Sequence, residues 1–299
     1  MTGTLIQLKL QKNQLDISSD FAKRVGSSNR WQILGRFKTI RRGYSLFQGQ
    51  LQRFKPQFYQ QRLNISTVSE ISPVQISKCV ENIQKTGVHL GLHLNQNAVQ
   101  QIISFARLNL CNEPKHNDFF FADEIKNGRL NGESRQVMRG LVSNLDKCQT
   151  VDKIVCDATL IEIARKYLGY YPTLITRHLT WSFACDLDEV DIQKLYPPTN
   201  FHYDVAGLNF VTASFFITDV DENTGPHIMI EKSHNRKPLQ MLLRSNIQKE
   251  TDVWRFYDRS EQLTITGNAG FGFFQDPSCI HRLKLPRNGN RLILQIRYS

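Results

Sequence analysis

The sequence predicts an α+β fold with a mainly β core, and the order of two hydrophobic periods along the chain is the main reason. Before Gly169, apolar residues recur at the three- and four-residue spacing of helices, whereas short β-rich runs bounded by turn residues follow it. The composition, with 40% hydrophobic and 22% charged residues among 299, is that of an ordinary globular protein. These observations predict a helical layer that supports a β-sandwich or barrel.

Three helices are expected in the first part of the chain. The first follows Ser72-Pro73, which fit an N-cap and a proline in the first turn, and it ends at Gly87. The second begins after Asn95, a favourable N-cap residue. The third covers residues 151–168 and ends at Gly169.

Six strands are expected in the second part of the chain. Each is a short run of β-branched, aromatic and other apolar residues bounded by turn residues. The runs cover residues 173–183, 208–217, 227–230, 263–265, 270–274 and 291–298. Residues 221–226, Asp-Glu-Asn-Thr-Gly-Pro, predict a turn between two of these strands.

Composition also limits the cellular setting. No apolar run approaches the ~18–20 residues that a membrane span needs, and residues 1–10 lack the pattern of a signal peptide. The six cysteines are scattered and form no C-x-x-C pair, which argues against a zinc ribbon and for reduced thiols. We therefore expect a cytoplasmic protein without a transmembrane segment.

Positive charge is concentrated at the start of the chain. Residues 1–69 contain twelve lysines and arginines but only two acidic residues, so they carry +10 of the formal net charge of +11. We expect residues 1–70 to form a basic, partly helical N-terminal extension and residues 71–299 to form the main domain. Such an extension could attract an anionic partner, but we favour a solvated, partly helical extension as the explanation of the charge.

Three residues in the second part of the chain predict a metal site. His202 and Asp204 form an H-x-D pair, whose side chains point the same way if the segment is extended. His281 follows 77 residues later, shortly before the last expected strand. Two histidines and one carboxylate are the facial triad of non-haem Fe(II) oxygenases, which leaves coordination positions open for a co-substrate and O2.

Arg291 is the fourth candidate site residue. It lies ten residues after His281 and opens the apolar run of the last strand. A guanidinium fixed there could bind a dicarboxylate through a two-pronged, charge-assisted contact.

Over roughly residues 150–299, these features resemble the phytanoyl-CoA dioxygenase family of Fe(II)/2-oxoglutarate-dependent oxygenases. The similar segments are Phe201-His-Tyr-Asp204, residues 215–226, Glu231-Lys-Ser-His234, residues 281–291 and Leu294-Gln-Ile-Arg-Tyr298. The chain departs from the family pattern by the extra Thr224 in its "N-G-P" turn. It also has Glu231-Lys232 where "P-G" is usual.

The resemblance implies a double-stranded β-helix, a cupin-like jelly roll, with supporting helices. It implies a dioxygenase that decarboxylates 2-oxoglutarate to succinate and hydroxylates a small-molecule or carrier-linked metabolite. By position, His202, Asp204 and His281 would bind Fe(II), and Arg291 would bind 2-oxoglutarate.

Two alternatives remain open at this stage. The basic extension, together with the R-x5-R spacing of Arg291 and Arg297, is compatible with an oxygenase that acts on nucleic acid. A non-catalytic binding module with the same fold is the other alternative.

Overall fold

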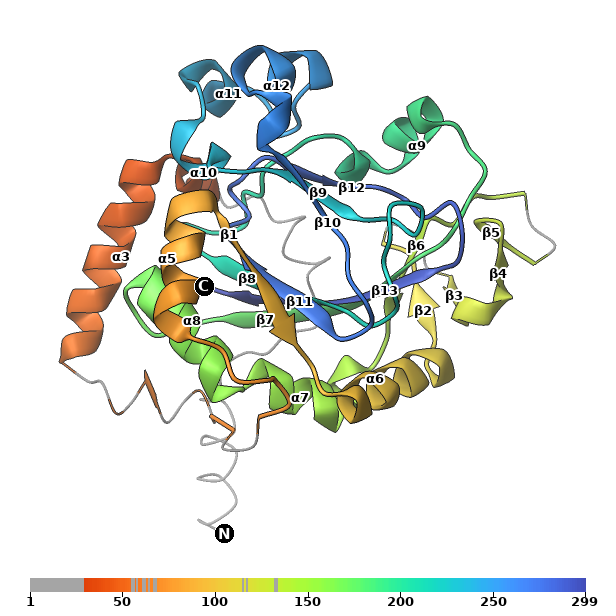
Figure 1. Ribbon diagram of the computed structural model, residues 1–299, viewed down its shortest axis with the longest axis horizontal. Helices are drawn as coiled ribbons and strands as arrows, with labels where there is room; N and C mark the ends of the chain where they lie inside the picture. Colours follow the sequence, from red (N-terminus) through yellow and green to blue (C-terminus); the bar gives the residue numbers. More distant parts are fainter. Residues whose placement is uncertain are drawn as a thin grey trace, which may run out of the picture.

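The computed structural model describes residues 30–54, 57, 59–60, 63, 65–66, 69–114, 116, 118–131 and 134–299 (Figure 1). Residues 1–29, the first part of the expected basic extension, therefore lie outside the described residues. No helix in the described part of the chain is both long and apolar enough to cross a membrane.

Two antiparallel sheets form the centre of the molecule. The larger sheet contains, in spatial order, β1 (Val88–His93), β11 (Phe271–Gln275), β8 (Val211–Phe216), β13 (Arg291–Tyr298), β7 (Ile175–Ser182), β6 (Arg139–Val142), β2 (Cys111–Asn112) and β3 (Phe119–Phe120). The smaller sheet contains β10 (Gln262–Ile265), β9 (His227–Ile230) and β12 (His281–Leu283). A separate hairpin pairs β4 (Ile125–Lys126) with β5 (Arg129–Leu130).

The two sheets face each other across an apolar cluster. Met229 and Ile265 of the smaller sheet pack with Phe216, Phe273 and Ile293 of the larger one. This arrangement confirms the expected α+β fold with a mainly β core of the cupin-like, double-stranded β-helix type.

Helices cover the other face of the larger sheet. These are α5 (Ile76–Thr86), α6 (Gln96–Leu108), α7 (Gln149–Val155) and α8 (Ala158–Leu168), which follow the left and lower sides of the sheet in Figure 1. Alternate residues of β13, namely Leu292, Leu294 and Ile296, are buried in the cluster shared with these helices. Because side chains alternate along a strand, Arg291 and Arg297 lie on the opposite face, toward the smaller sheet.

The remaining helices lie outside this layer. They are η1 (Arg30–Arg36), α3 (Lys38–Arg53), η2 (Ala122–Glu124), η3 (Leu145–Lys147), α9 (Glu189–Leu195), η4 (Pro197–Thr199), α10 (Ser233–Arg236), α11 (Leu239–Leu243), α12 (Glu250–Phe256) and η5 (Arg259–Glu261). In Figure 1, α10, α11 and α12 lie together above the sheets and α3 lies beside α5.

The expected helices form, with corrected boundaries. Asn95 caps α6 by accepting a hydrogen bond from the Ala98 amide, as predicted. The first helix begins at Ile76 rather than at Ser72-Pro73, so that N-terminal prediction was wrong. The third helix is in fact two, because the Asp157 carboxylate accepts from the amides of Thr159 and Leu160 and starts α8 anew.

Two glycines show how closely the chain packs. Gly87 ends α5 in the left-handed conformation, with φ of 93°, and a Cβ there would lie 2.2 Å from Cys279 Sγ. Gly35 of η1 lies so close to the loop after Asp204 that a Cβ would meet the Gly207 carbonyl oxygen at 2.2 Å. The described end of the basic segment thus packs directly against the loop that follows the H-x-D pair.

Candidate metal centre

The backbone brings His202 and His281 together. Their amides and carbonyls form a reciprocal pair, with N···O distances of 2.8 and 2.7 Å, although the residues are far apart in sequence. The two imidazole centroids lie 4.4 Å apart. His281 begins β12, so this pairing extends the smaller sheet by one bridge onto the 201–204 segment.

Asp204 completes the group. Its Oδ1 lies 3.8 Å from His202 Nε2 and 3.9 Å from His281 Nε2, and one candidate ligand atom from each residue lies within 4.8 Å of the others. The Asp204 amide donates to the Pro277 carbonyl oxygen at 2.9 Å, which ties the H-x-D segment to the turn before His281. The structure therefore brings together the three residues that the sequence predicts as metal ligands.

Both imidazoles present a lone pair to this group. His202 Nδ1 lies 2.9 Å from the Asn200 carbonyl oxygen, and His281 Nδ1 lies 2.8 Å from that of Cys279. A carbonyl oxygen only accepts, so each Nδ1 donates to it and each Nε2 is the ring nitrogen that faces Asp204. Backbone contacts of this kind fix the tautomer and the ring orientation of a metal-ligating histidine.

Protonation states also suit metal binding. Burial, followed by the charge of His202, lowers the pKa of His281 to about 4, so this imidazole is neutral at pH 7. Burial alone would raise the pKa of Asp204, but electrostatic interactions with His281, Arg297 and His202 outweigh it and lower that pKa. A neutral imidazole and an ionised carboxylate are the forms that bind a divalent metal.

Arg291 supplies a buried cation nearby. Its side chain is 2% exposed, Nη2 donates to Ser182 Oγ at 2.9 Å and Nη1 donates to the Gly225 carbonyl oxygen. Its Nε has no hydrogen-bond partner, and no carboxylate pairs with the guanidinium among the described residues. Burial lowers the pKa of Arg291 to about 10, so it stays charged at pH 7. A buried guanidinium without a counter-ion fits the carboxylate of a dicarboxylate ligand.

His227 interacts with both the triad and this cation. Its ring centroid is 5.3 Å from that of His281, and its charge interactions include both His281 and Arg291. Burial comes first among the causes that hold the pKa of His227 well below its usual range.

Arg297 is a site residue whose role the sequence did not indicate. Its Nη2 lies 3.2 Å from Asp204 Oδ2, while Asp204 Oδ1 faces the two histidines. The period of two along β13 places Arg297 on the same strand face as Arg291, and that spacing was the available signal.

The departure at Lys232 leaves the backbone turn intact. Lys232 has a φ of 62°, the left-handed conformation that the glycine of a "P-G" pair would favour. Ser233 follows in this turn. Its Oγ donates to the Ile230 carbonyl oxygen and accepts from the Ile280 amide. Ile280 precedes His281, so the turn supports the strand that carries this candidate ligand.

Comparisons with known proteins give a likeness in structure only. No protein-family model matches the chain, and no curated protein matches its sequence. Three solved structures are similar to this chain. EvdO2 from Micromonospora carbonacea var. aurantiaca complexed with 2-oxoglutarate has 11% identity, covers 78% of this chain and 94% of its own, and has a TM-score of 0.51.

The other two are Streptomyces proteins. AviO1 from Streptomyces viridochromogenes Tue57 has 15% identity, covers 76% of this chain and 96% of its own, and has a TM-score of 0.48. HygX from Streptomyces hygroscopicus with nickel, 2-oxoglutarate and hygromycin B bound has 11% identity, covers 74% of this chain and 86% of its own, and has a TM-score of 0.49. At these identities, the likeness to EvdO2 establishes a shared fold, and the chain has that fold.

Proposed function

We propose that this protein is an Fe(II)/2-oxoglutarate-dependent dioxygenase that hydroxylates a small-molecule or carrier-linked metabolite. The observation that carries the proposal is the convergence of His202, Asp204 and His281, with candidate ligand atoms within 4.8 Å of one another. The chain would then belong to the phytanoyl-CoA dioxygenase family, which its motifs resemble, with residues 71–299 as the catalytic domain.

The three side chains would hold the metal from one side. His202 and His281 offer their Nε2 atoms, and Asp204 offers Oδ1 while Arg297 occupies Oδ2. A set of two histidines and one carboxylate leaves further coordination positions for ligands from solution. Iron and 2-oxoglutarate, when bound, would supply oxidative decarboxylation with O2, coupled to hydroxylation of the second substrate.

Arg291 and Ser182 would orient the co-substrate. The guanidinium is anchored by Gly225 and Ser182 and keeps Nε without a partner. It would pair with the carboxylate of 2-oxoglutarate that is distant from the metal. Because the guanidinium is 2% exposed, this contact would form away from water and be stronger than a surface ion pair.

The face of β7 next to this site would contact the metabolite. Thr180 and His178 of β7 lie on the strand face that carries Ser182, because side chains alternate along the strand. Burial comes first among the causes that lower the pKa of His178 to about 3, so this ring is neutral. Neutral hydroxyl and imidazole groups suit hydrogen bonds to a polar, uncharged part of a substrate.

The nucleic-acid alternative receives no specific support from this geometry. The second arginine of the R-x5-R spacing, Arg297, contacts the metal-ligand candidate Asp204. In the basic segment, Arg36 donates to the carbonyl oxygens of Leu242 and Arg244, and Arg41 pairs with Asp276. These arginines are engaged within the protein.

Succinate formation from 2-oxoglutarate tests the proposal. With Fe(II), ascorbate and O2, the wild type should form succinate slowly even without a metabolite, and mixed metabolite pools should accelerate it. His202→Ala and Asp204→Ala should reduce the rate at least about 100-fold, since each removes a metal ligand. His116→Ala is the matched control, because His116 lies in a distant, exposed position beside Glu113.

Two results would overturn the proposal. One is an unchanged rate of succinate formation in both ligand variants, and the other is a wild type that forms no succinate with any pool. Incorporation of one 18O atom from 18O2 into the product would distinguish hydroxylation from another oxidation by the same centre.

A further inference from the structure

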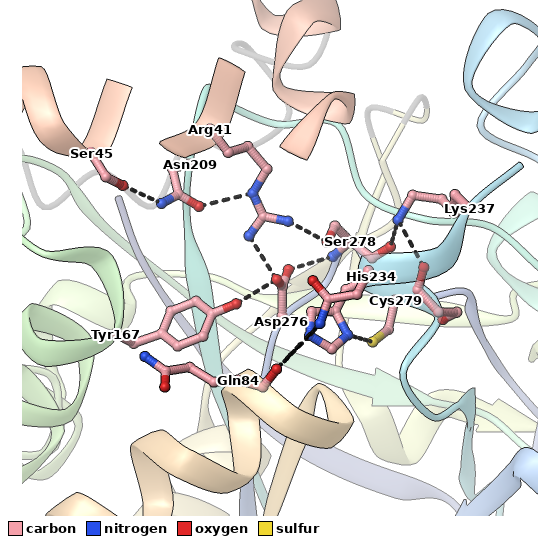
Figure 2. Close-up of polar contacts among 12 residues, drawn as sticks. Arg41, Ser45, Gln84, Tyr167, Asn209, His234, Lys237, Asp276, Ser278 and Cys279 are labelled. Atoms are coloured by element: carbon pink, nitrogen blue, oxygen red, sulfur yellow. Dashed lines mark hydrogen bonds and ion pairs between the residues drawn. The ribbon is translucent and has the colours of Figure 1, made fainter. Parts of the chain in front are cut away.

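A cavity lies outside the candidate metal centre, beside α3. It has a volume of about 550 Å³ and lies between α3, the end of α8, the end of α5 and the turn before His281. Figure 2 shows Arg41 reaching from α3 toward Asp276, with Tyr167 and Gln84 on the opposite side. None of His202, Asp204, His281 and Arg291 lines this cavity. Its size is typical of a site for a small molecule.

The acidic group of this cavity is already neutralised. Asp276 is 1% exposed, and its Oδ2 accepts from Arg41 Nη2 at 2.7 Å and from the Tyr167 hydroxyl at 2.5 Å. Its Oδ1 accepts from the Ser278 amide at 2.9 Å. Burial opposes ionisation, but Arg41 and these donors hold the pKa of Asp276 far below its usual range. Asp276 and Arg41 therefore cancel in charge.

Two further cations line the same cavity without a counter-ion. Lys38 and Arg42 are exposed residues of α3, and neither pairs with a carboxylate among the residues that the structure describes. They lie four residues apart on the helix, so their side chains are neighbours. Burial, then the charges of Arg42 and Arg41, lowers the pKa of Lys38, which shows that the cations repel one another. Burial holds the pKa of His234 down, so this ring adds no charge at pH 7.

We propose that this cavity binds a phosphate monoester, with the phosphate held between Lys38 and Arg42. The lining carries two uncompensated positive charges, and a phosphate monoester carries about −1.5 to −2 at pH 7. Arginine and lysine are the side chains that bind phosphate most often. Ser45 Oγ accepts from Asn209 Nδ2 at 2.8 Å, which leaves the Ser45 hydroxyl proton to donate to a phosphate oxygen.

The organic part of the ester has room beside the phosphate. A second cavity of about 370 Å³ continues along α3 and shares Ser45, Leu46 and Gly169 with the first. Tyr170 and Tyr171 line this continuation. Arg53 and Arg165 also line it, and Arg165 pairs with Glu162. The continuation therefore offers aromatic surface, together with further positive charge, to the organic part of the ester.

The proposed phosphate site is separate from the candidate metal centre, and residues 276–278 connect the two. Arg41 donates to Ser278 Oγ and Asn209 Oδ1, and the Pro277 carbonyl between Asp276 and Ser278 accepts from the Asp204 amide. Phosphate binding and metal binding thus use separate side chains, and each can be measured in the absence of the other.

Titration of the metal-free full chain with phenyl phosphate tests the proposal. Calorimetry in EDTA without 2-oxoglutarate should show saturable binding of one phenyl phosphate per chain at low salt. Phenyl sulfate, a monoanion with the same ring, should bind at least about tenfold more weakly, because it satisfies only one of the two charges.

Variants then place the site. The double variant Lys38→Gln/Arg42→Gln should weaken phenyl phosphate binding at least about tenfold, and Ser45→Asp should abolish it by adding a negative charge to the lining. Arg107→Gln/Lys126→Gln is the matched control, since it removes two exposed cations elsewhere. Thermal melting of each variant verifies that it is folded.

Three outcomes would refute the phosphate site. They are no saturable binding to the wild type, equal losses in the α3 variant and the control, and equal affinities for phenyl sulfate and phenyl phosphate. Since iron and 2-oxoglutarate are left out, failure here is distinguishable from failure of the proposed dioxygenase activity.

Discussion

Arg297 and Asp204 are in direct contact across the sheet interior, with Nη2 3.2 Å from Oδ2. The two carboxylate oxygens therefore have different neighbours. Oδ2 accepts from the arginine, and Oδ1 lies 3.8 and 3.9 Å from the two histidine Nε2 atoms. Arg297 thus leaves Oδ1 of Asp204 free to act as the proposed metal ligand and helps to keep the carboxylate ionised.

Replacing Arg297 should weaken metal binding. Arg297→Gln removes the charge that helps to lower the pKa of Asp204, and partners of metal ligands are typically worth about 10–100-fold in affinity. Anaerobic titration with Fe(II), or with Co(II) as a stable substitute, measures the loss. Arg107→Gln, an exposed position, is the control, and an unchanged affinity in Arg297→Gln would show that the contact does not orient the ligand.

Replacing Arg291 should separate co-substrate binding from metal binding. Arg291→Met removes the buried cation proposed to pair with 2-oxoglutarate, and loss of such a charged contact costs about 2–5 kcal/mol. The KM for 2-oxoglutarate should therefore rise at least about 30-fold, while affinity for Co(II) without 2-oxoglutarate stays within a factor of about three.

The same variant should not lower the stability of the metal-free protein. Arg291 has no counter-ion among the described residues, and an uncharged methionine avoids the cost of burying its charge. Urea unfolding measures this. A fall in unfolding free energy above about 2 kcal/mol, with an unchanged KM, would make Arg291 a structural residue.

Acid should destabilise the metal-free protein partly through His178. Burial, then Arg297 and Arg139, lowers the pKa of His178 to about 3, below the value near 6.5 in an unfolded chain. Between these values the unfolded state binds the extra proton. The contribution of neutral His178 to the unfolding free energy is therefore fully present above pH 6.5 and falls as the pH drops toward 3. His178→Gln should make the fall between pH 6 and pH 4 shallower by about 1.4 kcal/mol per pH unit. Urea unfolding at several pH values measures both slopes, and equal slopes would contradict the assignment.

Gly87 should be intolerant of a side chain, unlike Gly43. A Cβ at Gly87 would lie 2.2 Å from Cys279 Sγ on a backbone with φ of 93°, so Gly87→Ala should lower the unfolding free energy by at least about 1 kcal/mol. At Gly43, within α3, a Cβ meets nothing within 4 Å, so Gly43→Ala should raise it by up to about 1 kcal/mol. Thermal or urea unfolding compares the two. Equal effects would show that the end of α5 does not pack against Cys279 as described.

Local sequence signals predicted much of the fold. β9 and β13 begin and end where their β-rich runs do, because turn residues bound each run. Gly169 ends α8 in the left-handed conformation, with φ of 84°, as its position after the apolar stripe indicated. The change from helices to strands sufficed to predict the mainly β core.

Features that depend on tertiary contacts escaped prediction. β1 forms an edge of the larger sheet, but its bulge between Leu90 and Leu92 destroys the alternation that would mark a strand. The start of α8 depends on the buried Asp157, which also accepts from Ser69 at 2.5 Å. These are long-range contacts that no local period reveals.

Local sequence likewise predicted the residues of the candidate site but not the contacts between them. The motifs around His202, Asp204 and His281 identified the residues, but only the pairing of His202 with His281 shows that they meet. The contact of Arg297 with Asp204 and the cavity beside α3 both join distant segments, so neither could be read from local spacing.

An anaerobic crystal structure with Fe(II) and 2-oxoglutarate is the decisive measurement. It should show one ion bound by His202 Nε2, Asp204 Oδ1 and His281 Nε2 at about 2.0–2.2 Å, with a 2-oxoglutarate carboxylate on the Arg291 guanidinium. An ion bound elsewhere, or a triad that stays without metal at saturating Fe(II), would contradict the proposed function.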